Sequence, residues 1–289
     1  MAGLRIGTCS WKYPSWHGLV YSAPKGINYL REYTSHYNTV EIDQWFWSLF
    51  GETSIRLPKP ADVVAYRESV PDDFVFSVKL PNSLTLTHFY RKKKSDPQMS
   101  NAYFLSPALL ERFLSQLDPL RDVLGPVMFQ LEYRNRQKMQ SQKRFQELFD
   151  RFLEHVPRLY QYAMEIRNAN YLNKSYFEFL ERNGLGLVLL QGYYMPSIIG
   201  LYTRWKSYIL RHKLVVIRLH GPDRKGVEKR TGKRWNQIVD PKDEELREIA
   251  NMVAELLDHG ADVYVNVNNH YEGSAPLTID RIRRLLLDT

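Results

Sequence analysis

Eight short apolar segments alternate with eight amphipathic segments along the 289 residues of this chain, and this alternation constrains the fold most strongly. The apolar segments have the length and the β-branched and aromatic content of buried strands. They are residues 4–8, 39–42, 74–79, 127–130, 162–166, 187–190, 215–219 and 263–267. The amphipathic segments show helical spacing or helix-start residues, and they are 28–37, 60–69, 106–123, 142–155, 175–182, 196–211, 241–259 and 276–287.

Strict alternation of this kind is typical of α/β proteins with a parallel sheet. Eight strand–helix units fit a (β/α)8 barrel, whose usual size is about 250 residues. A doubly wound open sheet also alternates, but it typically has a glycine-rich phosphate turn after its first strand. Here that strand ends Gly7-Thr8-Cys9-Ser10-Trp11. We therefore predict one TIM-type barrel domain over residues 1–289, with its site at the carboxyl ends of the strands.

Proline and glycine mark several of the predicted helix ends. Pro60, Pro241 and Pro276 suit the first turn of a helix, where a missing N–H costs nothing. Gly184 and Gly260 follow their helices, as residues that end a helix often do.

The composition is that of a globular protein, with 44% hydrophobic and 25% charged residues. No apolar run is long enough to span a membrane, and the first residues lack a signal-peptide core, so we expect a cytoplasmic protein. The single cysteine, Cys9, excludes an internal disulfide and a cysteine-rich metal site. The net charge of +8 is concentrated in residues 204–234, which hold eleven Lys/Arg and two Asp/Glu.

Charged and amide side chains lie at or just after the ends of six predicted strands. Residues two apart on a strand share a face. The pairs that project together are Glu41 and Asp43, Glu165 and Arg167, and Arg218 and His220. If that face is the barrel interior, the groups converge at one mouth. The remaining members of the set are Lys79, Gln130, Asn268, Asn269 and His270.

As an enzyme site, this set divides into catalytic and binding residues. Glu41 and Glu165 would act as general acid and base, with His220 sharing proton transfer. Lys79 belongs to the catalytic set through its charge, and with Arg167 and Arg218 it would hold an anionic group such as phosphate. Gln130, Asn268 and Asn269 would orient the substrate. The alternative is purely structural, because Glu41 with Lys79, or Glu165 with Arg218, would also neutralise each other as buried ion pairs.

A divalent metal is a further hypothesis for the same residues. Glu41, Asp43, Glu165, His220 and His270 are donors of suitable types. The sequence contains no His-x-His or His-Glu-x-x-His spacing, so ligand spacing does not support the divalent-metal hypothesis, and no other cofactor is indicated.

Every predicted strand-to-helix loop carries an aromatic residue, and basic residues accompany two of these loops. Trp11, Tyr13 and Trp16 are the predicted binding residues among the aromatics, as a stacking surface for sugar rings or bases. The basic rim consists of Lys229, Arg230, Lys233 and Arg234, and a second basic run covers residues 91–94. Aromatics and basic charge on one face are typical of a nucleic-acid site. Packed lids and solvated surface loops are the alternative. The other loop aromatics are Trp45, Phe46, Trp47, Phe89, Tyr90, Tyr133, Tyr171, Tyr193, Tyr194, Trp235 and Tyr271.

At these same residues the chain resembles the YecE-like proteins of the DUF72 family, over nearly its whole length. The resemblance rests on ordered motifs at residues 11–18, 38–42, 74–81 with 87–88, 125–130, 165–167, 218–221 and 268–269 with 275–276. It implies a TIM-type barrel but supplies no reaction. The expected binding set also includes Asp43, from its place after the second strand, and His88, from the motif at 87–88. The chain departs from the usual family residues at Cys9, Asp43, Glu132, Asn168 and His270, which makes it a divergent member.

Two functions therefore fit the sequence. The first is an acid–base enzyme that acts on a phosphate-bearing or other anionic substrate, nucleic-acid components included, by hydrolase- or isomerase-like chemistry. The second is a non-catalytic module that binds nucleic acid or another polyanion through the basic aromatic rim. The oligomeric state is not predicted.

Overall fold

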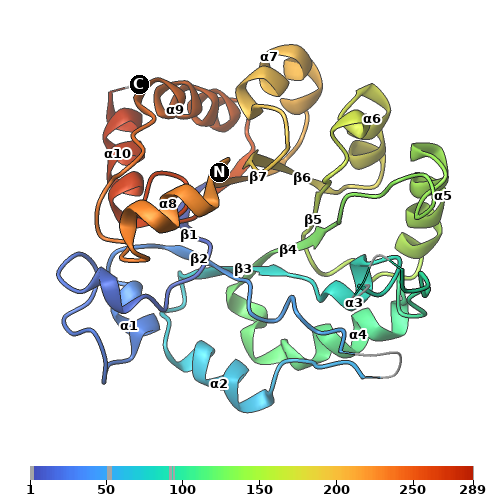
Figure 1. The fold of residues 1–289 in the computed structure, drawn as a ribbon, viewed down its shortest axis with the longest axis horizontal. Coiled ribbons are helices and arrows are strands. Elements are labelled where there is room, and N and C mark those ends of the chain that lie inside the picture. Colours follow the sequence, from blue (N-terminus) through green and yellow to red (C-terminus); the bar gives the residue numbers. More distant parts are fainter. Residues whose placement is uncertain (1–2, 51–53, 91–92, 94, 289) are drawn as a thin grey trace.

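The computed structural model describes residues 3–50, 54–90, 93 and 95–288. Eight parallel strands close into a barrel in chain order, and the pairing of the first strand with the last completes the ring (Figure 1). The TIM-type barrel is thus confirmed, and each strand agrees with its predicted segment to within three residues. The strands are β1 (Leu4–Thr8), β2 (Thr39–Ile42), β3 (Val75–Lys79), β4 (Leu124–Gln130), β5 (Tyr162–Glu165), β6 (Gly186–Gly192), β7 (Leu214–Gly221) and β8 (Asp262–Val267).

Helices surround the ring of strands, and Figure 1 looks approximately along the barrel. The α-helices are α1 (Tyr29–Tyr33), α2 (Pro60–Glu68), α3 (Asn82–Thr85), α4 (Pro107–Gln116), α5 (Gln142–Leu153), α6 (Lys174–Arg182), α7 (Ile198–Ile209), α8 (Arg224–Thr231), α9 (Asp243–Asp258) and α10 (Ala275–Leu287). Three 3-10 helices accompany them: η1 (Pro14–Trp16), η2 (Asp118–Val123) and η3 (Ala169–Tyr171). None of the helices described is long and apolar enough to cross a membrane.

The two faces of each strand serve different cores. On β7, Val215, Ile217 and Leu219 belong to the large apolar core between the sheet and the helices. Val216 belongs instead to a small separate cluster, and the next residues on its face are Arg218 and His220. Since side chains alternate along a strand, this face is the barrel interior, apolar at one end and charged toward the other. The small cluster consists of Met128, Ala163, Val188, Leu214, Val216 and Tyr264.

Three helix predictions need correction. The segment 106–123 is not one helix: α4 ends at Gln116 and the 3-10 helix η2 follows, because Pro119 lacks an N–H and disfavours helix before it. Pro241 does not enter a helix, since α9 begins at Asp243. The N–H of Lys242 instead donates to Glu272 Oε1 at 2.7 Å. The first predicted helix is shorter than expected, ending at Tyr33.

The basic segment after β7 is a helix and not the loop that we predicted. The Asp223 carboxylate accepts a hydrogen bond from the N–H of Gly226 at 2.8 Å and caps α8. Gly232 ends the helix in the left-handed conformation. An aspartate before and a glycine after the segment are ordinary helix signals, and the strong charge of the segment concealed them.

Candidate active site at the barrel mouth

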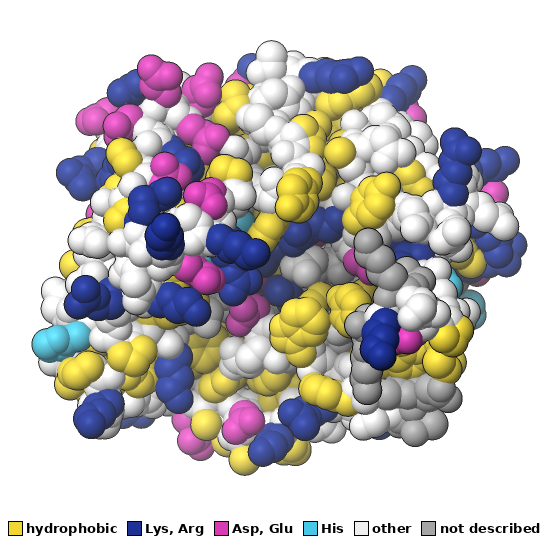
Figure 2. All heavy atoms as spheres, viewed as in Figure 1, with side chains coloured by type: hydrophobic (Ala, Val, Ile, Leu, Met, Phe, Trp, Pro, Cys, Tyr) yellow, Lys and Arg dark blue, Asp and Glu magenta, His cyan; other side chains and the backbone are white. Residues whose placement is uncertain are grey.

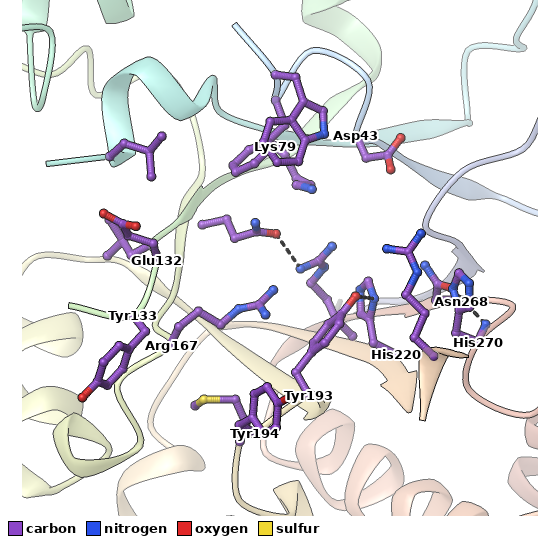
Figure 3. Close-up of a pocket in the computed structure, with 18 of the residues that line it drawn as sticks. Asp43, Lys79, Glu132, Tyr133, Arg167, Tyr193, Tyr194, His220, Asn268 and His270 are labelled. Carbon is purple, nitrogen blue, oxygen red and sulfur yellow. Dashed lines mark hydrogen bonds between the residues drawn. The ribbon is translucent and has the colours of Figure 1, made fainter. Parts of the chain in front are cut away.

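A cavity of about 940 Å³ opens at the carboxyl ends of the strands. Figure 2 shows this face of the molecule, with a hollow near its centre bordered by hydrophobic and basic side chains. The polar side chains that line the cavity come from six strands and their loops, and Figure 3 shows how most of them converge. They include Asp43, Lys79, Gln130, Glu132, Arg167, Arg218, Arg224, His220, Asn268 and His270.

Arg218 organises the floor of this cavity. Its Nη2 and Nε donate to the two carboxylate oxygens of Glu41 at 2.6 and 2.8 Å. Its Nη1 donates to Glu165 Oε2 and to Gln130 Oε1. All three charged side chains are at most 2% exposed. The predicted convergence of these strand ends inside the barrel is therefore confirmed, with Glu41 and Glu165 on two sides of one guanidinium.

Glu165 and Arg218 stay charged in this network. Burial by itself would raise the pKa of Glu165, but Arg167 and Arg218 outweigh burial and lower it to about 2. Burial would likewise lower the pKa of Arg218, and the two glutamates instead raise it well above its usual value. Arg167 donates from Nε to Glu165 Oε1 at 2.5 Å. A carboxylate held in this way stays ionised at neutral pH and is a poor proton donor.

Asp43 and Lys79 lie above this network without such partners. In the described part of the chain, neither side chain forms an ion pair, and the Asp43 carboxylate accepts no side-chain hydrogen bond. Lys79 Nζ lies 4.3 Å above the ring of Phe46. Burial raises the pKa of Asp43 to about 6, with Lys79 opposing and Glu41 reinforcing the shift. Burial and the nearby Arg218 lower the pKa of Lys79.

His220 connects two further groups on the cavity wall. Its Nδ1 lies 3.0 Å from the hydroxyl of Tyr193, and its Nε2 lies 3.6 Å from Cys9 Sγ. Burial and the positive charge of Arg218 lower the pKa of His220 well below its usual value, so the imidazole is neutral. Burial and Glu41 raise the pKa of Cys9, so the thiol remains protonated. This cysteine is thus not an activated nucleophile.

Two glycines allow the ends of β6 and β7 to meet beside His220. Gly192 has a φ of 125° and Gly221 a φ of 75°. A Cβ atom on Gly192 would lie 2.4 Å from the carbonyl oxygen of Gly221. The same turn holds Tyr193 at a φ of 54°, a conformation that is costly for a bulky residue. Strained backbone beside a cavity is common at functional sites.

Comparison with known proteins identifies the family of the chain. The model of the family described as "protein of unknown function DUF72" matches residues 5–289. The chain belongs to the DUF72 family. The resemblance expected from the sequence is thereby confirmed.

Relatives of this DUF72 chain have been found by sequence and by structure. UPF0759 protein YecE of Escherichia coli K12 is 29% identical over 181 residues, which make up 62% of this chain and 54% of YecE. The match therefore spans about half the length of that relative. A DUF72 protein from Enterococcus faecalis V583 has a TM-score of 0.68 at 18% identity, covering 99% of this chain and 96% of its own. One from Thermotoga maritima MSB8 has a TM-score of 0.66 at 22% identity, covering 98% and 99%.

Several predicted binding residues of the DUF72 chain lie outside the cavity lining. Trp11 and Trp16 are buried in the main core, and Trp16 Nε1 donates to the side-chain oxygen of Asn269 at 3.3 Å. The same oxygen of Asn269 accepts from the N–H of Ala275 at 2.9 Å, so this amide fixes the start of α10. His88 hydrogen-bonds Thr87 beside the lining. Of the three aromatics predicted to bind, only Tyr13 lines the cavity.

Except for Phe89, which is half-buried outside the lining, the loop aromatics divide into two groups. One group is buried as packing between loops and helices, as the alternative interpretation held: Trp11, Trp16, Trp45, Tyr171, Trp235 and Tyr271. The other group lines the cavity: Tyr13, Phe46, Trp47, Tyr90, Tyr133, Tyr193 and Tyr194. Sequence position alone did not separate them, because loop length and loop path decide which rings turn inward.

The basic rim lies on and just after α8, outside the lining of the cavity. Lys229, Arg230, Lys233 and Arg234 are all exposed. Arg230 lies within 3.8 Å of Asp240 and 3.6 Å of Asp223, so part of its charge is balanced. Of the second basic run, Arg91, Lys92 and Lys94 lie outside the described residues.

The residues considered as metal ligands do not form a ligand set. Among the residues that the structure describes, no three His, Cys, Asp or Glu are arranged to hold a metal ion. The oxygens of Glu41 accept hydrogen bonds from Arg218, and those of Glu165 accept from Arg218 and Arg167. His270 hydrogen-bonds Asn268 and Glu228.

Two features of the site, and one buried arginine outside the cavity lining, were not predicted. The contact between Tyr193 and His220 required the tight turn at Gly192, for which the glycine was the only sequence signal. Arg224 lines the cavity from the first turn of α8, a segment predicted as loop. Arg134 is buried over the ring of Phe145, at 4.2 Å, and no nitrogen of its guanidinium has a hydrogen-bond partner among the described residues. No sequence signal pointed to Arg134.

Proposed function

We propose that this protein is an enzyme that performs acid–base chemistry on a small anionic substrate bound at the barrel mouth. The observation that carries the proposal is that Asp43 and Lys79 both face the cavity without an ion-pair partner among the described residues. Both are largely buried, both line the cavity, and both have a pKa shifted toward neutrality. Titratable groups with shifts of this kind in a cavity are typical of catalytic sites.

The cations of the lining account for the anionic substrate. Lys79 forms no ion pair within the described residues. Among the same residues, Arg167 contacts Glu165 through Nε alone, which leaves both terminal nitrogens for a ligand. In Figure 3, Lys79 and Arg167 point into the cavity from different sides. Many TIM barrels bind phosphate at the start of a short helix after β7 or β8. Here the Asp223 carboxylate occupies the start of α8, so side chains would have to bind the anion.

Proton transfer falls to groups that are not committed to the ion-pair network. With a pKa of about 6, Asp43 is ionised in most molecules at neutral pH and accepts a proton without a large penalty. Lys79 would stabilise the negative charge that develops on the substrate. The neutral His220, hydrogen-bonded to Tyr193, would supply a second proton-transfer unit. Catalytic roles for Glu41 and Glu165 remain predictions, and this proposal assigns them only to holding Arg218.

The test is turnover of a panel of small phosphorylated and carboxylated compounds by the wild-type protein, Asp43→Asn and Lys79→Met. Asp258→Asn is the matched control, since Asp258 is exposed at the far end of α9. We expect turnover of at least one compound, with a loss of about 100-fold or more in Asp43→Asn and none in the control. Full activity in Asp43→Asn would overturn the assignment.

Binding of nucleic acid by the basic rim remains a prediction, and none of the observed contacts favours it. Affinity for a single-stranded oligonucleotide should fall steeply with salt if the rim binds phosphates. It should also fall when Lys229, Arg230, Lys233 and Arg234 are neutralised together. No binding at low salt would dispose of this alternative.

A further inference from the structure

We propose that the substrate carries a planar aromatic ring in addition to its anionic group, and that two aromatic walls of the cavity hold this ring. The inference rests on the proposed function, because the anionic group is placed on the same Lys79 and Arg167. It goes beyond that function by specifying the second half of the substrate.

The first wall runs from the cavity floor to its rim along the loops after β2 and β3. It begins where Lys79 Nζ lies 4.3 Å above the Phe46 ring. The rings of Phe46 and Trp47 follow at a centroid distance of 5.1 Å, and those of Trp47 and Tyr90 at 6.2 Å. Three aromatic rings therefore extend from the Lys79 ammonium group toward the solvent.

The second wall repeats this arrangement on the loop after β6. The guanidinium of Arg167 lies 4.8 Å above the ring of Tyr193. Tyr194 comes next in the chain and also lines the cavity, as does Tyr133 from the loop after β4. Figure 3 shows Tyr193 and Tyr194 across the cavity from Lys79. Each wall thus places a positive charge deep in the cavity and aromatic surface above it.

The outer rings of both walls are strongly exposed. Trp47 is 59% exposed, Tyr90 57%, Tyr133 63% and Tyr194 101%. Phe50, away from the lining, is also exposed, but the Arg56 guanidinium lies 4.5 Å over its ring. Large aromatic side chains grouped on one face, at the edge of a cavity, mark a site where a ligand covers them.

The size and chemistry of the cavity favour a ring-bearing small molecule over a simple sugar phosphate. A volume of about 940 Å³ lies at the upper end of the range for small-molecule sites. Among the described residues, Lys79 forms no ion pair and Arg167 has only its Nε bonded to Glu165, so these two cations are free to meet one anionic group. The walls above offer mainly π-faces, which hold a planar ring by stacking.

The test is calorimetric binding of three probes to the full chain: adenosine 5′-monophosphate, ribose 5-phosphate and adenosine. We expect the ring-bearing phosphate to bind about tenfold or more tightly than ribose 5-phosphate. Trp47→Ala should abolish this difference and leave the affinity for ribose 5-phosphate unchanged, whereas Trp47→Phe should retain most of it. Leu159→Ala, which removes an exposed apolar side chain before β5, is the control and should change nothing.

The outcomes separate this inference from the function on which it rests. Equal affinities for adenosine 5′-monophosphate and ribose 5-phosphate, with binding lost in Lys79→Met, would overturn the proposed ring-binding site. They would still support the anion site at Lys79. Binding of adenosine that depends on Trp47, with no gain from the phosphate, would overturn the anion site and with it the two-part substrate. Binding of none of the probes would overturn both.

Discussion

At the scale of single residues, the acidic and basic groups at the mouth fall into two sets of opposite character. The carboxylate oxygens of Glu41 and Glu165 accept hydrogen bonds from Arg218, and Arg167 also donates to Glu165. Our proposal gives both glutamates the role of holding Arg218. Asp43 and Lys79 lie one layer higher and lack such partners among the described residues. Glu41, Asp43 and Glu165 all lie at or just after strand ends, but only the two glutamates contact the Arg218 guanidinium. The pKa of Glu165 is therefore lowered, whereas that of Asp43 is raised.

Removing Arg218 should destabilise the protein severely. Arg218→Met would leave two buried carboxylates without their partner, a loss of about 3–5 kcal/mol in the free energy of unfolding. Arg167→Met should cost much less, because Arg167 is partly exposed and Glu165 keeps Arg218. Urea denaturation measures both values. Equal losses in the two variants would contradict the network as described.

Replacing Asp43 by asparagine should stabilise the protein at neutral pH. The folded state binds this proton more tightly than the unfolded chain, since burial raises the pKa of Asp43 from 3.8 to about 6. Stability is therefore lost as pH rises through that window. Asp43→Asn avoids this loss, and we expect a gain on the order of 3 kcal/mol at pH 8 that disappears below about pH 4. Unfolding curves at the two pH values measure the gain, and a loss of stability at pH 8 would contradict it.

At the scale of elements, the strands were predictable and the mouth was only partly so. Buried parallel strands read as short apolar runs, and the period of two along residues 215–219 was enough to predict that Arg218 and His220 share a face. The helix α8 and the split of α4 from η2 were missed where local signals, an aspartate cap and Pro119, competed with stronger patterns. The inward turn of Tyr193 was not predictable, because it depends on contact between two separate strand ends.

Replacing Gly221, where β7 meets the end of β6 and the loop after β8, should lower the free energy of unfolding more than replacing Gly232 at the end of α8. Gly221→Ala would place a Cβ 2.6 Å from the carbonyl oxygen of His270, at a φ of 75°. Gly232→Ala has a similar φ of 57° but no described atom within 4 Å. We expect Gly232→Ala to cost about 1 kcal/mol and Gly221→Ala clearly more. Thermal unfolding of both variants measures this, and equal costs would show that the mouth relaxes freely.

At the scale of the whole molecule, the barrel separates three layers along its axis. The apolar cluster around Val216 fills one end of the interior, the Arg218 network forms a charged layer above it, and the cavity opens above that layer. The concentration of basic charge in residues 204–234 was evident from the sequence, yet it spans both the buried Arg218 and the exposed rim. Residues 204–213 of this stretch lie on α7 and the turn that leads to the start of β7, away from the carboxyl ends of the strands. Charge along the chain therefore did not by itself distinguish the cavity from its surroundings.

The central claim is that Asp43 is a titratable group near neutrality at the mouth of this barrel. The direct measurement is a carbon-13 NMR titration of the Asp43 carboxyl, assigned by the signal missing in Asp43→Asn. We expect a pKa of about 6, and a higher value in Lys79→Met, because Lys79 lowers the pKa of Asp43. A pKa near 3.8 that does not respond to Lys79→Met would show that Asp43 does not titrate near neutrality.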